Sequence, residues 1–252
     1  MNSGRPALIR IVMSATPNDE DSALTATRTL SPIERQVSLG ERAYLQLKEL
    51  LMSGGMRVGT KLTVRYVADE FGISTTPARD AITRLIGEGG FVNLGPKTVI
   101  VPYLTMADLE EITAMRLSLE GLAAERAVEH IIPSDIAALE QIQERLNAGL
   151  DAARYGDVLD ANREFHFLLY RRSSMRRLVA VIESLWVRIG PSLNELYPEF
   201  AQSRTGVLNH SYALKGLQDR DSAAVRAAIE SDIRGGFRRL QSFVSASTPK
   251  ED

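Results

Sequence analysis

Residues 62–86 read LTVRYVADEFGISTTPARDAITRLI and predict two short helices joined by a tight turn. In the first helix, over about 64–71, apolar residues recur at the i, i+3, i+4 and i+7 spacing of a single helix face. Gly72 can take the left-handed backbone conformation that commonly ends a helix. Ser74 is then the expected N-cap of the second helix, and Pro77 falls in its first turn, where a missing N–H costs little. The stretch therefore predicts a helix-turn-helix unit.

The second helix of this unit has an apolar side and a polar side. At about 100° per residue, the apolar side carries Ala78, Ala81, Ile82, Leu85 and Ile86. Another side carries Thr76, Arg79 and Thr83, and Thr75 lies at the exposed N-terminus. Hydroxyl groups, an arginine and free N–H groups at a helix start suit the phosphates and base edges of a DNA major groove. A solvated helical hairpin would show the same pattern, so this segment alone leaves both interpretations open.

A further helix and a β-hairpin flank this unit. The helix is predicted over 39–52, with a glycine pair at 54–55 to close it. Its apolar surface is expected to consist of Ala43, Leu45, Leu47, Leu50 and Leu51. After a second glycine pair at 89–90, strand-like runs at 91–94 and 98–101 are separated by Gly-Pro-Lys, which predicts a hairpin with a basic tip. Helix, helix-turn-helix and hairpin together make a winged helix-turn-helix.

Over 39–101, this order of elements and residues resembles the GntR-type transcriptional regulators. The resemblance is carried by the pattern LxxRxxAxxxGISxTPxRxAIxRLxxxG, followed by a wing. It implies a homodimer that binds a near-palindromic operator in double-stranded DNA through two winged domains. The side chains expected to contact DNA, from the resemblance and from the basic wing tip, are Arg65, Ser74, Thr75, Thr76, Arg79 and Lys97.

Two departures from the family pattern concern the choice of operator. Arginine is usual where this chain has Thr75, and a glycine is usual around Thr98, where this wing is one residue shorter. We expect docking on DNA to survive both changes. The operator sequence, however, is not expected to be the same as that of other family members.

Length and composition set broad limits. A chain of 252 residues with 44% hydrophobic content can bury a sizeable core and is expected to hold two domains. The absence of cysteine excludes a disulfide framework and a thiolate metal site, and it fits a reducing compartment. No apolar run approaches the roughly 18 residues of a membrane span. Because the weak apolar run at 7–15 is broken by Arg10, a signal peptide is not expected either, and we predict a cytoplasmic protein.

The net charge of −2 is unevenly distributed. Residues 39–104 carry eight Lys/Arg against six acidic residues, whereas residues 105–252 carry eighteen against twenty-two. The predicted DNA-binding half is therefore slightly basic and the second half acidic. So small an excess favours specific binding by a dimer over indiscriminate attraction to polyanions.

The chain divides into four predicted segments: a flexible N-terminal arm at 1–35, a winged-helix domain at 36–104, a helical domain at 105–246 and a short tail at 247–252. The arm is rich in Ser, Thr, Ala and Pro without sustained periodicity. After Thr105, which with Asp108 forms an expected helix-starting box, strand signals are absent from the sequence. Helices are predicted at about 106–131, 134–153, 157–173, 175–197, 205–218 and 221–245. Six helices of this length predict an antiparallel bundle, so the fold class is mainly α.

Four residues of this bundle form a candidate metal site. Asn162 and His166 are four residues apart, so both side chains leave one face of a helix. His210 and Asp232 are 22 residues apart across a short turn, which allows two antiparallel helices to bring them to one level. From spacing alone, a hydrogen-bonded core histidine at His166 and an unrelated His210 are the favoured interpretation.

Residues 106–245 resemble the FCD domain of FadR-like GntR regulators, through MRLSLEGLAAERA, NREFHFLLY, the later His210 and the DI pair before the last helix. The resemblance implies a divalent metal held by Asn162, His166, His210 and Asp232. Many members have a third histidine at the position of Asp232 and an aspartate at that of Asn162, and both exchanges keep an oxygen ligand. Two imidazoles with a carboxylate and an amide oxygen suit Zn, Ni or Mn.

Such a site leaves net positive charge for an anionic effector, by which we mean a small molecule that changes operator affinity. We predict a small carboxylate effector that reaches the metal, with Arg116 and Arg188 as candidates to bind its other oxygen. A salt bridge, for example between Arg116 and Glu120, is the alternative role for these arginines. His130 is expected to interact with the C-terminal end of its helix instead of a metal.

The predicted function is a metabolite-responsive transcriptional regulator, most simply a repressor. Three other functions stay open: a regulator of the same class that binds an apolar acyl chain, one whose metal is purely structural, and a metal-dependent enzyme. The enzyme is disfavoured because Glu164, the nearest candidate general base, is two residues from His166 and so on the wrong helix face. The sequence also contains no nucleophile elbow, phosphate loop or dinucleotide-binding pattern.

Overall fold

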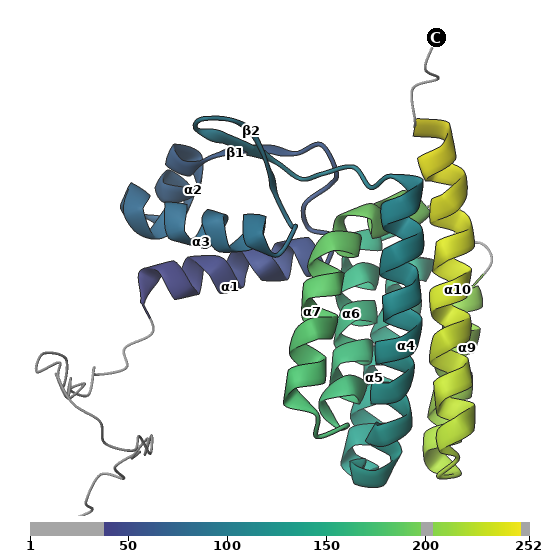
Figure 1. Cartoon of the computed structure of the whole chain (residues 1–252). Helices are drawn as coiled ribbons and strands as arrows, with labels where there is room; N and C mark the ends of the chain where they lie inside the picture. Colours follow the sequence, from purple (N-terminus) through teal and green to yellow (C-terminus); the bar gives the residue numbers. More distant parts are fainter. Residues whose placement is uncertain (1–37, 198–203, 248–252) are drawn as a thin grey trace, which may run out of the picture. The chain divides into compact units, whose positions relative to one another are not determined.

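The computed structural model describes residues 38–197 and 204–247. The predicted arm at 1–35 and nearly all of the predicted tail lie outside the described residues. The N-terminal elements, labelled as in Figure 1, are α1 (Leu39–Met52), β1 (Lys61–Thr63), α2 (Val64–Phe71), α3 (Thr75–Gly87), β2 (Val92–Gly95) and β3 (Thr98–Ile100). The predicted three helices and hairpin are confirmed.

The three strands form one antiparallel sheet in the order β1-β3-β2. Leu62 pairs with Val99, and both side chains are buried against the helices. The short strand β1 was not predicted, because three residues give too little alternation to detect. The hairpin begins one residue later than expected, since Phe91 is fully buried in the core instead of lying in the wing.

The helix-turn-helix forms for the local reasons expected from its sequence. The Thr63 hydroxyl accepts a hydrogen bond from the Tyr66 N–H at 3.1 Å and so caps the start of α2. Gly72 ends α2 with φ of 62°, a left-handed conformation that costs glycine little. Ser74 is the N-cap of α3 by backbone geometry, but its hydroxyl makes no capping hydrogen bond.

One prediction about α1 is wrong. Leu47 and Leu51 are buried against α3, as expected, but Leu45 is 50% exposed and Leu50 is 38% exposed. Leu45 lies two residues before Leu47 and thus about 200° around the helix, on the side that α3 does not cover. The predicted apolar surface was therefore too wide.

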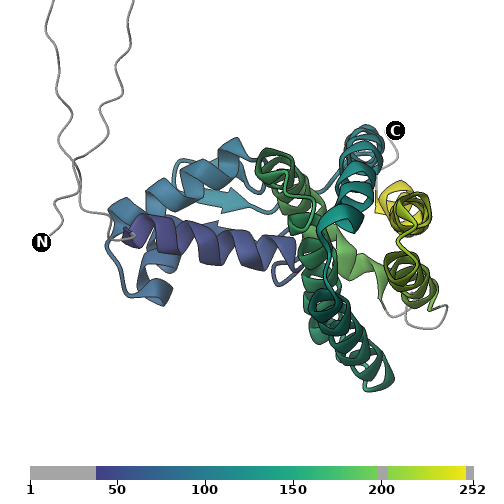
Figure 2. The ribbon, with the colours of Figure 1, turned by 90° about the horizontal axis from the view of Figure 1, so that it is seen from below.

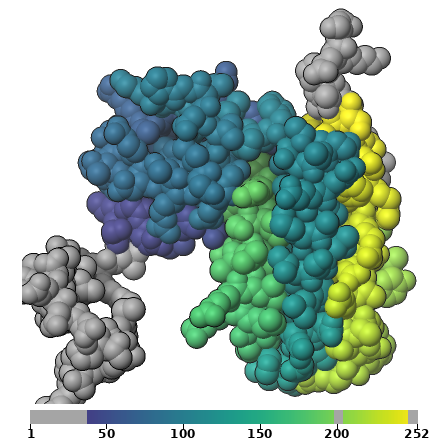
Figure 3. Space-filling view, in the orientation of Figure 1, coloured from purple at the N-terminus to yellow at the C-terminus, as the bar shows by residue number. Residues whose placement is uncertain are grey.

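The second part of the described chain is a bundle of helices. Its elements are α4 (Met106–His130), α5 (Pro133–Asp151), α6 (Tyr155–Arg171), α7 (Arg176–Ile189), the 3-10 helix η1 (Gly190–Leu196), α9 (Thr205–Gln218) and α10 (Ser222–Ser247). Figure 2 shows most of these helices end-on, and the space-filling view in Figure 3 shows α4 and α10 in contact along one face. The predicted helix at 175–197 changes to 3-10 geometry at Gly190, because Pro191 lacks the N–H that an α-helix needs. No helix in the described ranges is both long enough and apolar enough to cross a membrane.

The predicted box at the start of α4 is confirmed. The Asp108 N–H donates to the Thr105 hydroxyl at 3.1 Å, and the Thr105 N–H donates to the Asp108 carboxylate at 2.9 Å. The Thr105 side chain and backbone hydrogen bonds lower the pKa of Asp108.

The C-terminal end of α1 contacts α7 and η1 directly. Lys48 pairs with Glu183 of α7 at 2.9 Å, and the Asn194 side chain of η1 donates to the Gly54 carbonyl. Gly190 lies so close to α1 that an added Cβ would overlap the Leu51 carbonyl oxygen. The helix that leads into η1 is therefore packed on the winged N-terminal part of the described chain.

Candidate metal centre

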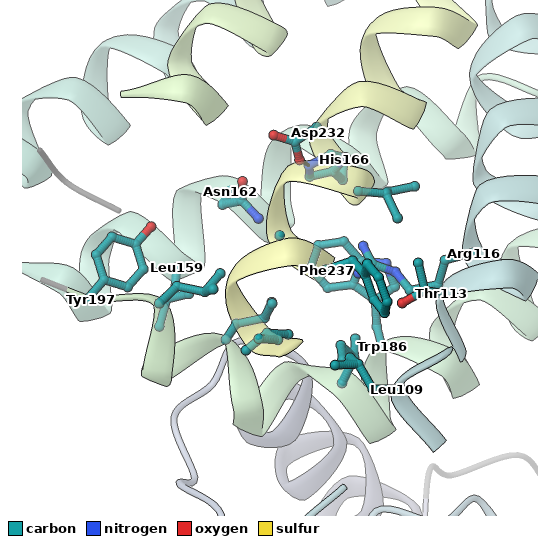
Figure 4. Close-up of a pocket in the computed structure, with 16 residues that line it drawn as sticks. Leu109, Thr113, Arg116, Leu159, Asn162, His166, Trp186, Tyr197, Asp232 and Phe237 are labelled. Atoms are coloured by element: carbon teal, nitrogen blue, oxygen red, sulfur yellow. Dashed lines mark ion pairs between the residues drawn. The ribbon is translucent and has the colours of Figure 1, made fainter. Parts of the chain in front are cut away.

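A cavity of about 40 Å³ lies inside the bundle, lined by side chains of α4, α6, α7, η1 and α10 (Figure 4). Its polar lining consists of Thr113, Arg116, Asn162, His166, Tyr197 and Asp232. The remaining lining is largely apolar and includes Leu109, Trp186, Leu193, Leu196, Phe237 and Leu240. Since one water needs roughly 10–15 Å³ of such cavity space, the cavity holds only a few atoms unless its walls move.

Three side chains from three helices converge beside this cavity. His166 of α6 and His210 of α9 place their Nε2 atoms 3.3 Å apart, and Asp232 of α10 places Oδ2 3.4 Å from His166 Nε2. Donors bound about 2.1 Å from one tetrahedral ion lie roughly 3.4 Å from each other. The three donor atoms, all within 4.8 Å of one another, therefore fit a single divalent ion.

The surroundings of His210 prepare its Nε2 as a ligand. Burial, and then the neighbouring His166, lower the pKa of His210 to about 3, so its imidazole is neutral near pH 7. The Gln143 amide donates to the Asn147 side chain at 3.1 Å, which turns its carbonyl Oε1 toward His210 Nδ1 at 2.7 Å. His210 Nδ1 therefore carries the hydrogen and donates to Gln143, which leaves the lone pair of Nε2 for a metal.

Asp232 supplies the negative charge of the cluster. Burial opposes its ionisation, but the adjacent His166 and His210 imidazoles outweigh that effect and lower the pKa of the carboxyl group. The Asn209 side chain also donates to Asp232 at 3.4 Å. The donor set is thus two imidazole nitrogens and one carboxylate, which suits a borderline divalent cation.

Asn162 lies one helical turn before His166 and lines the same cavity, next to His166 and Asp232 in Figure 4. Its amide group is thus available beside the three converging donors. Its role as a fourth ligand stays a prediction.

The two predicted effector arginines are separated in the structure. Arg116 is buried and lines the cavity, while its guanidinium pairs with Glu120 at 2.6 and 3.3 Å, so the predicted alternative salt bridge is present as well. Arg188 does not line this cavity; its Nε donates to the Glu88 carbonyl at 2.9 Å. It lies two residues beyond Trp186, about 200° around α7, and therefore faces α3. The structure thus places Arg188 outside the cavity lining, and its effector role stays a prediction.

Sequence reasoning named Glu120 only as a salt-bridge partner of Arg116, and it missed Tyr170 and Trp186. Glu120 is fully buried, Tyr170 bonds to His166 Nδ1 at 2.9 Å, and the Trp186 ring centroid lies 5.4 Å from that of His166. The available signal was the i, i+4 spacing of Arg116 to Glu120 and of His166 to Tyr170, which puts each pair on one helix face. It did not indicate that the two pairs meet across α4 and α6.

The predicted DNA-contacting residues Arg65, Ser74, Thr75, Thr76, Arg79 and Lys97 are all exposed. Four of them lie at the start of α3 or within its first two turns, and Lys97 lies at the turn of the wing between β2 and β3. Arg65 lies 3.7 Å from Asp69 in a solvent-exposed pair, which is weak and easily exchanged for a phosphate contact.

The fold and the cluster together define a class of protein: a winged-helix DNA-binding transcriptional regulator with a C-terminal helical domain. The family of bacterial regulatory proteins named gntR matches residues 39–91, and the FCD domain family matches residues 111–235. The chain belongs to the GntR family, in the FadR-like branch that carries an FCD domain. The buried triad of His166, His210 and Asp232 is consistent with the metal site typical of FCD domains.

Two curated relatives and one solved structure illustrate the membership. The HTH-type transcriptional regulator McbR of Escherichia coli K12 is 32% identical over 197 residues, covering 77% of this chain and 89% of that protein. The gluconate operon transcriptional repressor of Bacillus subtilis is 26% identical over 212 residues, covering 79% and 83%. The structure of E. coli McbR/YncC superposes with a TM-score of 0.76 at 29% identity, over 82% of this chain and 99% of that one. These relatives are transcriptional regulators, and this chain is a regulator of the same family.

Proposed function

We propose that this regulator is a repressor whose operator affinity is controlled by a small carboxylate bound at a metal in the bundle cavity. The observation that carries the proposal is the convergence of His166, His210 and Asp232 beside the buried guanidinium of Arg116. A divalent ion there, of the Zn, Ni or Mn class, supplies a Lewis-acidic centre for a carboxylate oxygen. Asn162 is the proposed fourth ligand.

Arg116 is the proposed partner of the second carboxylate oxygen. Its guanidinium has more donors than the two that Glu120 occupies, and guanidinium groups match carboxylates in planar geometry. The small volume of the cavity favours an effector with few atoms. The mostly apolar remainder of the lining favours a short apolar substituent over a polar one.

The proposed DNA contact is made by α3 lying in the major groove of each half-site of a near-palindromic operator. Exposed hydroxyl groups of Ser74, Thr75 and Thr76 accompany the free N–H groups at the start of α3, which suits phosphates. Arg79 is placed one turn later to reach base edges, and Lys97 to contact the backbone from the wing. Reading two half-sites requires a homodimer.

The proposed link between cavity and DNA is α7 with η1. Trp186 and Ile189 line the cavity, whereas Val187 packs so closely on the turn after α3 that a Cβ at Gly90 would lie 2.6 Å from it. Arg188 holds the Glu88 carbonyl at the end of α3. A shift of α7 on effector binding therefore changes the position of α3, and the two recognition helices no longer reach both half-sites together.

The exposed Glu164 bears on the enzyme alternative. It forms an ion pair with Arg145 of α5 and does not line the cavity. Glu164 therefore does not lie where a general base of a metal-dependent enzyme would be needed. This agrees with the relatives, which are regulators. An apolar acyl ligand is the second candidate effector, favoured only by the apolar lining, and it requires a much larger cavity than the one present.

The test compares His166→Ala with His130→Ala, in which an exposed histidine at the end of α4 is removed as a matched control. Purified wild type and His130→Ala should contain about one divalent metal per chain by plasma mass spectrometry, and His166→Ala should contain none. DNA duplexes that the wild type selects from a random pool should bind all three proteins. Carboxylates from a panel of two to six carbons should weaken the DNA binding of the two metal-containing proteins only.

Two results contradict the proposal. If His166→Ala contains as much metal as the wild type, the proposed set of metal ligands is wrong. A metal-loaded wild type whose DNA affinity is unchanged by every carboxylate in the panel would leave the metal as a structural one.

A further inference from the structure

Glu120 of α4 is fully buried and accepts four hydrogen bonds, although it does not belong to the donor cluster. Its Oε1 accepts from Arg116 Nε at 2.6 Å and from Trp186 Nε1 at 3.0 Å. Its Oε2 accepts from Arg116 Nη2 at 3.3 Å and from the Tyr170 hydroxyl at 2.6 Å. Glu120 thereby joins α4, α6 and α7 at one point behind the metal centre.

The hydrogen bonds of Tyr170 have a fixed direction. A phenol has one hydrogen to donate, and the Glu120 carboxylate, which can only accept, takes it at 2.6 Å. The other neighbour of the Tyr170 oxygen is His166 Nδ1 at 2.9 Å. Since the hydroxyl hydrogen is already used, the oxygen can only accept there, so His166 Nδ1 must carry the imidazole hydrogen.

We propose that Glu120 is a positioning residue which, through Tyr170, selects the His166 tautomer that presents the lone pair of Nε2 to the metal. The other tautomer would carry a hydrogen on Nε2, in the space between His210 Nε2 and Asp232 Oδ2. Fixing a ligating histidine by a hydrogen bond at its other nitrogen orients the ring and raises metal affinity. The inference rests on the metal site proposed above, and it adds a residue that never touches the metal.

Glu120→Gln reverses this relay while keeping the shape of the side chain. Two neutral or cationic donors, Arg116 Nε and Trp186 Nε1, require an acceptor at the Oε1 position, so the amide oxygen stays there. The amide nitrogen then faces Tyr170 and donates to its oxygen. The tyrosine hydroxyl is left to donate to His166 Nδ1, and the hydrogen of the imidazole moves to Nε2, where it blocks the metal.

The experiment is a double-mutant cycle on the full-length protein, with Zn²⁺ affinity measured by competition with a chromophoric chelator. Tryptophan fluorescence is not suitable here because Glu120 itself bonds to Trp186. Glu120→Gln should weaken Zn²⁺ binding at least about tenfold, the lower end expected for an outer-shell partner. In a Tyr170→Phe background, which removes the relaying hydroxyl, Glu120→Gln should change Zn²⁺ affinity less than about twofold.

Tyr44→Phe is the matched control, since the Tyr44 hydroxyl also donates to a glutamate, Glu88, at 2.6 Å but lies in the winged domain. It should leave Zn²⁺ affinity unchanged. Equal weakening by Glu120→Gln with and without the Tyr170 hydroxyl would overturn the inference, because Glu120 would then act through packing or charge. Wild type that binds no Zn²⁺ would instead overturn the metal site itself.

A second measurement keeps the inference open to refutation if Glu120→Gln does not fold. Two-bond ¹H–¹⁵N spectra of the metal-free wild type distinguish hydrogen on Nδ1 from hydrogen on Nε2, and the chain has only three histidines to assign. His166 should carry its hydrogen on Nδ1 in the wild type. A wild-type His166 with hydrogen on Nε2 and none on Nδ1 would overturn the proposal.

Discussion

Arg79 and Arg116 are both helical arginines, and their surroundings give them opposite tasks. Arg79 projects from α3 into solvent, so its guanidinium is free to meet a base edge. Arg116 is buried beside the cavity and held by Glu120, so it is pre-positioned for a carboxylate. Burial of Arg116 disfavours its charge, but the adjacent Glu120 carboxylate outweighs that effect and raises the pKa of the guanidinium.

At the residue scale, Arg79→Ala should remove specific operator binding while leaving the fold intact. A bidentate contact to a base is worth about 1–3 kcal/mol, and the proposed dimer would lose two such contacts. The measurement is fluorescence anisotropy with the selected duplex and with a scrambled duplex. Arg176→Ala, which removes another exposed arginine at the start of α7, is the control and should bind as the wild type does. Normal operator affinity in Arg79→Ala would show that α3 is not the recognition helix.

At the scale of elements, α7 and η1 contact the winged N-terminal part on one side and line the bundle cavity on the other. Val187, Arg188 and Gly190 contact α1 or the end of α3, whereas Trp186 and Ile189 face the cavity. The 3-10 turn at Pro191 lets the chain continue past α1 at very short range. A helix with both neighbours is well placed to transmit a change of packing from one to the other.

Gly190→Ala should destabilise the chain, because its Cβ would overlap the Leu51 carbonyl oxygen and lie 2.9 Å from that of Met52. Inserting a methyl group against backbone costs about 1–3 kcal/mol. The free energy of unfolding in urea measures the loss. Gly156→Ala in α6 is the matched control; no described atom lies within 4 Å of its Cβ, and the change should stay within about 1 kcal/mol. Equal stability of the two variants would contradict the close packing of η1 on α1.

At the scale of the whole molecule, the candidate metal centre takes its three donor residues from three helices, α6, α9 and α10. His166 Nε2 lies 3.3 Å from His210 Nε2 and 3.4 Å from Asp232 Oδ2, and donor atoms this close repel or compete for hydrogens unless a cation lies among them. A bound metal therefore stabilises the folded chain over the unfolded one. The slightly basic N-terminal half and the acidic bundle remain chemically distinct parts of the same chain.

Removal of the metal should lower the melting temperature. At a free metal concentration one hundred times the dissociation constant, binding adds about 2.7 kcal/mol, which corresponds to roughly 5–10 °C for a chain of this size. The measurement is thermal unfolding followed by circular dichroism, before and after chelation and after Zn²⁺ is restored. The melting temperature of the wild type should fall on chelation and return to its first value when Zn²⁺ is restored. An increment of the same size in His166→Ala would place the stabilising metal elsewhere.

The sequence by itself determined most helix boundaries and the residues expected to contact DNA and a metal. Helix boundaries at α1, α2 and α9 follow from caps, glycines and apolar periodicity, because these act within a few residues. The same 3.6-residue period puts Asn162 and His166 on one face of α6. The GntR-type pattern around Arg79 and the FCD-type pattern around His166 were likewise legible, because each lies within one short stretch of chain.

Only the tertiary structure decided which distant side chains meet. That His210 and Asp232 reach His166, and that Glu120 and Tyr170 join behind it, depends on the packing of four helices, on which local periodicity carries no information. The rotation of α7 about its axis decided that Trp186, and not Arg188, faces the cavity. The same reason accounts for the exposed Leu45 and for β1: a side chain's burial and a short strand's pairing are set by neighbours that the sequence places far away.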